Sequence, residues 1–133
     1  MGKRSSLQIA RAITTFVQTL PPPPPLKPAS EDPADEAQLA RGEALFHGLG
    51  CVDCHVPALG YTSNATYNVG LRDENGMTKF NPPSLRGVSQ GYSFFHDGRA
   101  KKLEDVFVTH RHPYGEVMPN DELADLLRFL SSL

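Results

Sequence analysis

One five-residue segment limits what this chain can fold around: Cys51-Val52-Asp53-Cys54-His55. Its two cysteines are the only ones among 133 residues, two positions separate them, and a histidine follows at once. This spacing is typical of c-type haem attachment, in which the thiols form thioether bonds to the haem and the adjacent imidazole binds the iron. We therefore expect one covalent haem c, attached through Cys51 and Cys54, with His55 as the proximal ligand.

Two other uses of a Cys-x-x-Cys pair fit this sequence less well. A zinc site needs a second pair of cysteines or histidines at ligand spacing, and the remaining histidines form no such pair. These are His47, His96, His110 and His112. A thioredoxin-like dithiol lies in a βαβ pattern, whereas this chain has almost no alternating β-branched segments. Haem attachment is the interpretation that the motif favours.

Length and charge narrow the class of protein. A chain of 133 residues holds one domain and some extension. Its formal net charge of −2 gives no indication of a nucleic-acid partner. Because a domain this small buries only a modest share of its own surface, a haem would supply much of the apolar core. We expect the protein without haem to fold poorly.

The region before the motif is expected to form an amphipathic helix and a linker. Apolar residues recur on one helical face between Leu7 and Leu20, and we expect that face to pack on the haem domain. The segment is too short and too polar to span a membrane. Pro21 to Pro25 ends the helix, since proline has no backbone donor. We assign residues 1–20 to the helix, 21–34 to a proline-rich linker and 35–133 to the haem domain.

The haem domain is predicted to be mainly α, with a cytochrome c-like fold of about three to four helices around one covalent haem. Helices are expected at 35–49, 103–110 and about 120–130, the last capped by Asn120 or Asp121 and packed on the helix before the motif. Residues 56–91 form a long loop around the haem. Its candidate haem contacts are Tyr61, Tyr67, Leu71, Phe80 and Leu85.

An electron-transfer haem needs a second axial ligand, for which the candidates are Met77, His96, His110, His112 and Met118. In a helix from 103 to 110, His110 continues the buried stripe of Leu103, Val106 and Phe107. We therefore expect His110 to be the sixth ligand. Met118, which precedes Pro119, is the alternative.

Several stretches together resemble the C-terminal haem domain of the bacterial di-haem cytochrome c peroxidase and MauG-like family. They are Phe80 to Val88, Phe95 to Gly98, Leu103 to Val106, and the final Asp121 to Leu130. The resemblance covers about 35–133 and implies a helical domain whose haem transfers electrons. It also implies residue roles, because the family's sixth ligand lies on the helix after the His-Asp-Gly segment.

Counting from His96, that ligand position is His110. Arg86 resembles the arginine near the haem propionates, and His96 the histidine at the haem edge; Phe95 belongs to the same segment and is a further candidate contact. One departure matters. The family's peroxide-reacting haem belongs to an N-terminal domain with its own Cys-x-x-Cys-His, and this chain has one such motif.

The sequence therefore favours a mono-haem c-type cytochrome that carries or relays single electrons between redox partner proteins. Haem attachment of this kind also predicts a periplasmic or otherwise exported protein, although residues 7–20 do not read as a signal peptide. The alternative function is the haem domain of a di-haem peroxidase or oxidase whose catalytic domain is not in this chain. Residues 7–25 are a candidate docking segment for a larger redox complex.

Overall fold

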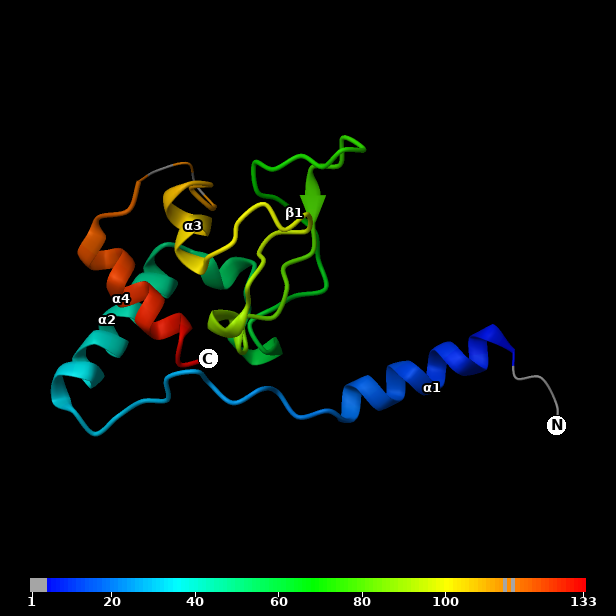
Figure 1. The fold of residues 1–133 in the computed structure, drawn as a ribbon, viewed down its shortest axis with the longest axis horizontal. Coiled ribbons are helices and arrows are strands. Elements are labelled where there is room, and N and C mark those ends of the chain that lie inside the picture. Colours follow the sequence, from blue (N-terminus) through cyan, green and yellow to red (C-terminus); the bar gives the residue numbers. More distant parts are fainter. Residues whose placement is uncertain (1–4, 114, 116) are drawn as a thin grey trace.

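The computed structural model describes residues 5–113, 115 and 117–133. Within them the chain is mainly helical, as predicted, with four α-helices and one two-stranded antiparallel sheet (Figure 1). The helices are α1 (Ser6–Thr19), α2 (Pro33–Gly48), α3 (Leu103–Val108) and α4 (Asn120–Leu130). Strands β1 (Tyr67–Asn68) and β2 (Lys79–Phe80) are joined by a long loop, and single 3-10 turns lie at Cys51–Asp53, Pro57–Leu59 and Val88–Gln90. This arrangement is compatible with a cytochrome c-like fold.

Helices α2 and α4 pack against each other and form the core, as the sequence predicts. Phe46 of α2 is buried among Leu126, Phe129 and Leu130 of α4. The bounds of α4 match the prediction, but its cap does not. The N-cap position is Pro119, which offers no side-chain hydrogen bond, so neither Asn120 nor Asp121 caps the helix.

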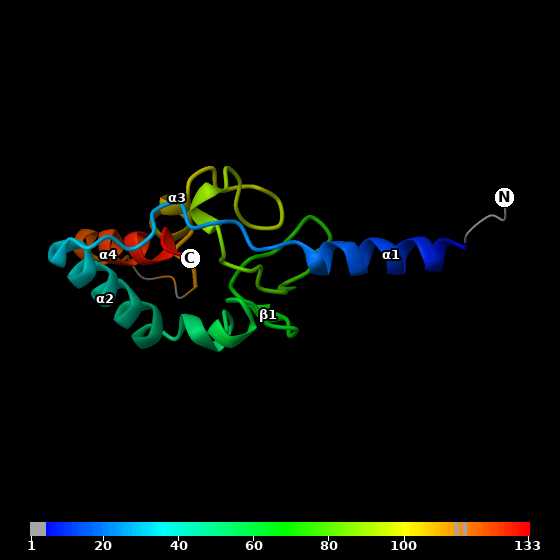
Figure 2. The same cartoon turned by 90° about the horizontal axis from the view of Figure 1, so that it is seen from below.

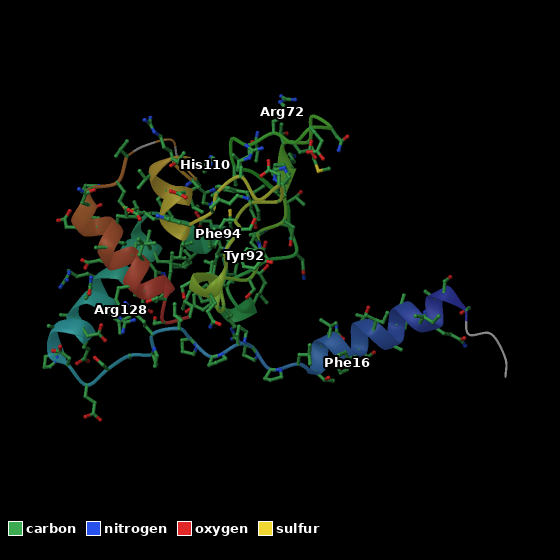
Figure 3. All side chains as sticks on the ribbon, viewed as in Figure 1. Phe16, Arg72, Tyr92, Phe94, His110 and Arg128 are labelled. Atoms are coloured by element: carbon green, nitrogen blue, oxygen red, sulfur yellow. The ribbon has the colours of Figure 1, made fainter. Side chains whose placement is uncertain are left out.

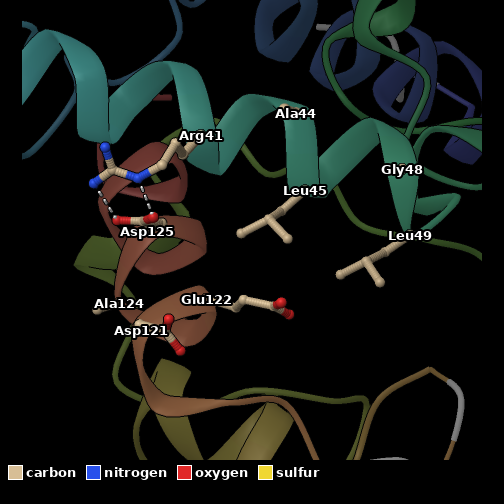
Figure 4. Close-up of a pocket in the computed structure, with 9 residues that line it drawn as sticks. All are labelled: Arg41, Ala44, Leu45, Gly48, Leu49, Asp121, Glu122, Ala124 and Asp125. Atoms are coloured by element: carbon tan, nitrogen blue, oxygen red, sulfur yellow. Dashed lines mark hydrogen bonds and ion pairs between the residues drawn. The ribbon is translucent and has the colours of Figure 1, made fainter.

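The two helices approach closely at Gly42. A Cβ atom at this position would lie 2.7 Å from Cβ of Phe129, and closer still to the carbonyl oxygen of Asp125. Next to it, Arg41 donates to both carboxylate oxygens of Asp125, at 2.6 and 3.1 Å (Figure 4). An exposed ion pair contributes little stability by itself. Together with the glycine, however, it fixes how α2 crosses α4.

Arg128 of α4 connects the helix pair to the proline-rich segment. Its guanidinium donates to both carboxylate oxygens of Asp35 on α2, at 2.6 and 2.7 Å. It also donates to the carbonyl oxygens of Lys27 and Pro28. Further along, Gln90 donates to the carbonyl oxygen of Pro24. The segment between α1 and α2 therefore lies along the helical domain, as both ribbon views show (Figures 1 and 2).

The Arg128–Asp35 pair predicts a loss of stability in acid. The Arg128 guanidinium, followed by the Ser30 hydroxyl, holds the pKa of Asp35 well below its ordinary 3.8. A carboxylate with a lowered folded-state pKa stabilises the fold above its unfolded-state pKa, and this contribution is lost as the pH falls through the folded-state value. We expect the urea midpoint of unfolding to decrease below about pH 4, and Asp35→Asn to flatten that decrease. An equally steep acid slope in the variant would contradict the assignment.

Helix α1 does not pack on the haem domain, contrary to expectation. It begins with a capping box formed by Ser5 and Gln8, but every one of its residues is exposed. Phe16, for example, is 62% exposed and lies apart from the other elements (Figure 3). The segment that follows α1, including Pro24, Lys27 and Pro28, makes the contacts with the domain. Among the described residues, no helix combines the length and the apolar character needed to cross a membrane.

Candidate functional site

A cavity of about 820 Å³ lies beside the α2–α4 core, between the Cys-x-x-Cys-His segment and α3. Cys51, Cys54 and His55 line it. Much of the remaining wall is apolar and comes from the helices and the long loop. These side chains include Phe46, Phe80, Leu85, Val88, Phe94, Leu103, Val106, Phe107, Leu126 and Leu130. The volume falls within the roughly 300–1,000 Å³ usual for cofactor sites.

The backbone turns sharply as it enters the motif. Gly50 adopts a left-handed φ of 70° directly after α2, and residues 51–53 form a 3-10 turn. The amide of His55 donates to the carbonyl oxygen of Cys51 at 2.9 Å. The turn therefore gathers both thiols and the imidazole at one wall of the cavity.

Burial sets the protonation of the motif's side chains. It raises the pKa of Cys51 to about 11 and also raises the pKa of Cys54, so both thiols are protonated at neutral pH. Burial lowers the pKa of His55, which favours the neutral imidazole. Neutral imidazole is the form of histidine that binds metals.

The backbone carbonyl groups of Tyr61 and Pro83 interact with the ring of His55. Its Nδ1 lies 3.0 Å from the carbonyl oxygen of Tyr61. Because a carbonyl oxygen only accepts, Nδ1 must carry the proton, and the lone pair is on Nε2. Ligating histidines are commonly oriented in this way by a carbonyl behind them.

Another histidine, His112, lines the same cavity. Its Nδ1 is buried and has no hydrogen-bond partner within the described part of the chain. Burial, followed by the charge of the nearby His55, lowers the pKa of His112 to about 4. Two neutral imidazoles from segments far apart in the sequence therefore share one cavity.

The cavity gathers most of the site residues predicted from the sequence. Besides the motif, these are Tyr67, Arg86, Phe95 and His96. Of the loop residues named as contacts, Leu71, Phe80 and Leu85 also line the cavity, whereas Tyr61 contributes its carbonyl oxygen to His55. What each residue does at a bound cofactor stays a prediction.

The two residues predicted as sixth ligands lie outside the cavity lining. His110 follows α3 (Figure 3) and packs edge-on against Phe95, with ring centroids 5.1 Å apart. Met118 packs against the core of α2 and α4. Met77 is 54% exposed.

Three residues with unusual backbone conformation adjoin the cavity. Among the described residues, Tyr61, Phe95 and Arg111 are the only non-glycine residues with positive φ, at 60°, 66° and 51°. Such a conformation costs a side-chain-bearing residue about 1 kcal/mol and tends to cluster at functional sites. Each of the three positions a group at this cavity: Tyr61 the acceptor for His55, Phe95 its own ring, and Arg111 the adjoining His112.

A second hollow lies between α2 and α4, where Arg41, Leu45, Asp121 and Glu122 contribute to the lining (Figure 4). Within the described part of the chain, its lining contains neither a cysteine nor a histidine. It offers no thiol for covalent attachment and no imidazole, so of the two hollows the first is the one suited to a c-type haem.

Comparison with known proteins agrees with this chemistry. The family model for di-haem cytochrome c peroxidase matches residues 38–128, a span that includes the motif and both histidines after α3. The chain belongs to the di-haem cytochrome c peroxidase family. It is similar to the cytochrome c551 peroxidase of Nitrosomonas europaea, with 33% identity over 109 residues. It is also similar to the methylamine utilization protein MauG of Methylorubrum extorquens, with 28% identity over 155 aligned positions.

The match covers most of this chain and a smaller part of the relatives. It takes in 69% of this chain and 33% of the Nitrosomonas protein, and 94% of this chain and 43% of the Methylorubrum protein. The chain thus spans less than half the length of either relative and corresponds to a haem domain of this family. The family binds c-type haem, and the cavity fits that group through its size, its two thiols and the two histidines, His55 and His112, in its wall.

Proposed function

We propose that this chain holds one haem c through Cys51 and Cys54 and relays single electrons. The observation that carries the proposal is the cavity itself, where both thiols, His55 and His112 share an apolar enclosure. When bound, haem supplies a one-electron couple between ferric and ferrous iron. We place the protein in an exported compartment such as the periplasm, where haem is attached to such motifs.

The chain's own residues prepare the cavity for this role. His55 presents the lone pair of Nε2, because the carbonyl oxygen of Tyr61 holds the proton on Nδ1. The segment after α3 carries His110 and His112, either of which offers a second imidazole. If His55 and one of these histidines both held the iron, no open position would remain for peroxide, and the bound haem would be suited to electron transfer. The apolar walls exclude water, and such burial helps to set the reduction potential.

The loop between the motif and α3 is held in place as the cavity's outer wall. Asn81 donates to the carbonyl oxygens of Ser63 and Ala65 at 2.7 and 2.8 Å. Ser84 donates to the carbonyl oxygen of Gly60 at 2.7 Å. These bonds join distant parts of a segment that has little secondary structure of its own. The position of the wall therefore does not depend on contacts with a cofactor.

A redox titration and a peroxide assay on the full chain with haem attached test the proposal. We expect a reversible one-electron transition. We also expect peroxide to oxidise a reduced donor no faster in the presence of the protein than with free haem. Donor oxidation well above that background would assign the chain to the enzymes and contradict the carrier role.

A second candidate function is the electron-delivering part of a peroxidase. The observation that favours it is the similarity to a protein named cytochrome c551 peroxidase. In this alternative, the haem held in the same cavity would pass electrons to a catalytic haem on another domain. Peroxide turnover that appears only when a separate catalytic domain is added would distinguish this role from a free carrier.

A further inference from the structure

We propose that His112, and not His110, is the side chain that binds the iron on the side away from His55. The inference rests on the proposed haem domain and names the residue that completes its coordination. It is based on the position of His112 in the cavity wall, on the lack of a hydrogen bond from its Nδ1 within the described residues, and on the backbone turn that brings it there.

The backbone after α3 reverses direction and carries His112 inward. Helix α3 ends at Val108, and Arg111 adopts a left-handed φ of 51°. The amide of His112 then donates back to the carbonyl oxygen of Val106 at 3.1 Å. This bond and the left-handed Arg111 end the helical path and turn the chain back toward Val106. Because Val106 lines the cavity, the turn brings His112 to the same wall.

His112 also has no other role for its ring among the described residues. Its Nδ1 is enclosed by protein without a hydrogen-bond partner, and burying a polar group unpaired is costly. The ring lines the cavity on which the thiols and His55 converge. Of its two ring nitrogens, Nε2 is the one that a metal in the cavity would bind, while Nδ1 stays enclosed and, within the described residues, unpaired.

His110 is placed differently by the same turn. Its amide donates to the carbonyl oxygen of Asp105 at 3.0 Å, and its ring packs edge-on against Phe95. Phe95 lines the cavity, whereas His110 does not. His110 therefore supports the wall through Phe95, which makes it a packing residue in this arrangement.

His96 is the remaining histidine on the cavity wall, and its ring is already engaged. It stacks on Phe80 with ring centroids 4.3 Å apart. Its Nε2 lies 3.9 Å from a carboxylate oxygen of Asp97, and its ligand atom gathers with those of Asp73 and Glu74. A ring nitrogen that faces carboxylates is poorly placed to bind haem iron.

Paired alanine variants of the full, haem-loaded chain test the inference by absorption and paramagnetic resonance of the ferric protein. We expect wild type to be low-spin with two imidazole ligands. His112→Ala should become high-spin, and added imidazole should restore the low-spin signal. His110→Ala should remain low-spin. High-spin iron in His110→Ala together with low-spin iron in His112→Ala would assign the ligand to His110 and overturn the inference, and low-spin iron in both would do the same.

Methionine variants keep the test decisive if an alanine variant fails to fold. A thioether in place of an imidazole raises the haem potential, so His112→Met should be low-spin with a higher potential, and His110→Met should keep the wild-type potential. The reverse pattern would contradict the inference. Failure of the proposed function is distinguishable, because wild type would then carry no covalent haem or would oxidise a donor with peroxide well above the free-haem background.

Discussion

Replacing both Cys51 and Cys54 by alanine is expected to abolish covalent haem attachment. Both thiols line the cavity, and the described residues provide no other sulfhydryl group there. Haem that remains in the double variant would be held by axial ligands and apolar contact alone. It should separate from the protein in denaturing gels and in acidified organic solvent, whereas wild-type haem should migrate with the chain.

Covalent attachment of the haem is also expected to contribute to the stability of the fold. A ligand that binds only the folded state stabilises it by an amount that grows with the logarithm of the ligand concentration relative to Kd. A covalent link raises the local haem concentration far above that of free haem. The double variant should therefore unfold at a lower temperature and depend on added haem. Asp53→Ala is the matched control, since it changes the same turn and leaves both thiols intact. Covalent haem in the double variant would refute attachment through these cysteines.

The helical part of the fold could be predicted because its sequence signals are local. The stripe of Leu123, Leu126 and Leu130 gives a buried face at helical spacing, and α4 forms between its predicted bounds. Helix α2 begins earlier than expected, at Pro33, because the side chain of Asp32 accepts from the amide of Ala34. Proline is well suited to the first helical turn, where its missing donor has no cost.

The position of the second histidine could not be obtained from periodicity. The helical face that selects His110 assumes that α3 continues to residue 110, but the helix ends at Val108. The reversal depends on a left-handed Arg111, and arginine gives no sequence signal for that conformation, unlike glycine. Pro113 indicates a helix end nearby, but it does not indicate which histidine turns inward.

In α1 the sequence pattern predicts the helix correctly but not the burial of its apolar face. Its apolar stripe correctly predicts a helix, yet Ile13 and Phe16 are 58% and 62% exposed. Amphipathic periodicity reports that a face favours burial and carries no information about what covers it. The proline-rich segment, by contrast, has a defined partner, because the carbonyl oxygens of Lys27 and Pro28 accept hydrogen bonds from Arg128. These acceptors are backbone carbonyl oxygens, which any extended segment exposes, so the sequence of the segment does not indicate where it binds.

A single methyl group at Gly42 should have a larger effect on stability than any other conservative change in α2. In an ordinary helix interior, Gly→Ala gains about 1 kcal/mol from helix propensity. At Gly42 the new Cβ would meet the Asp125 carbonyl oxygen and lie 2.7 Å from Cβ of Phe129, and neither group can swing aside as a flexible side chain could. Separating α2 from α4 would loosen the core around Phe46. Such overpacking costs about 1–3 kcal/mol, so the clash should outweigh the propensity gain.

We expect Gly42→Ala to lower the free energy of unfolding by about 2 kcal/mol and Tm by roughly 10 °C, measured by thermal and urea denaturation of the haem-loaded protein. Gly48→Ala is the matched control, because it makes the same change in the same helix where no neighbour lies within 4 Å of the added Cβ. It should be neutral or slightly stabilising. Equal effects at the two positions would mean that α2 and α4 do not meet at Gly42. Since α2 leads directly into Cys51 and α4 lines the cavity through Leu126 and Leu130, the same loosening should also broaden the low-spin ferric signal in Gly42→Ala and leave it sharp in Gly48→Ala.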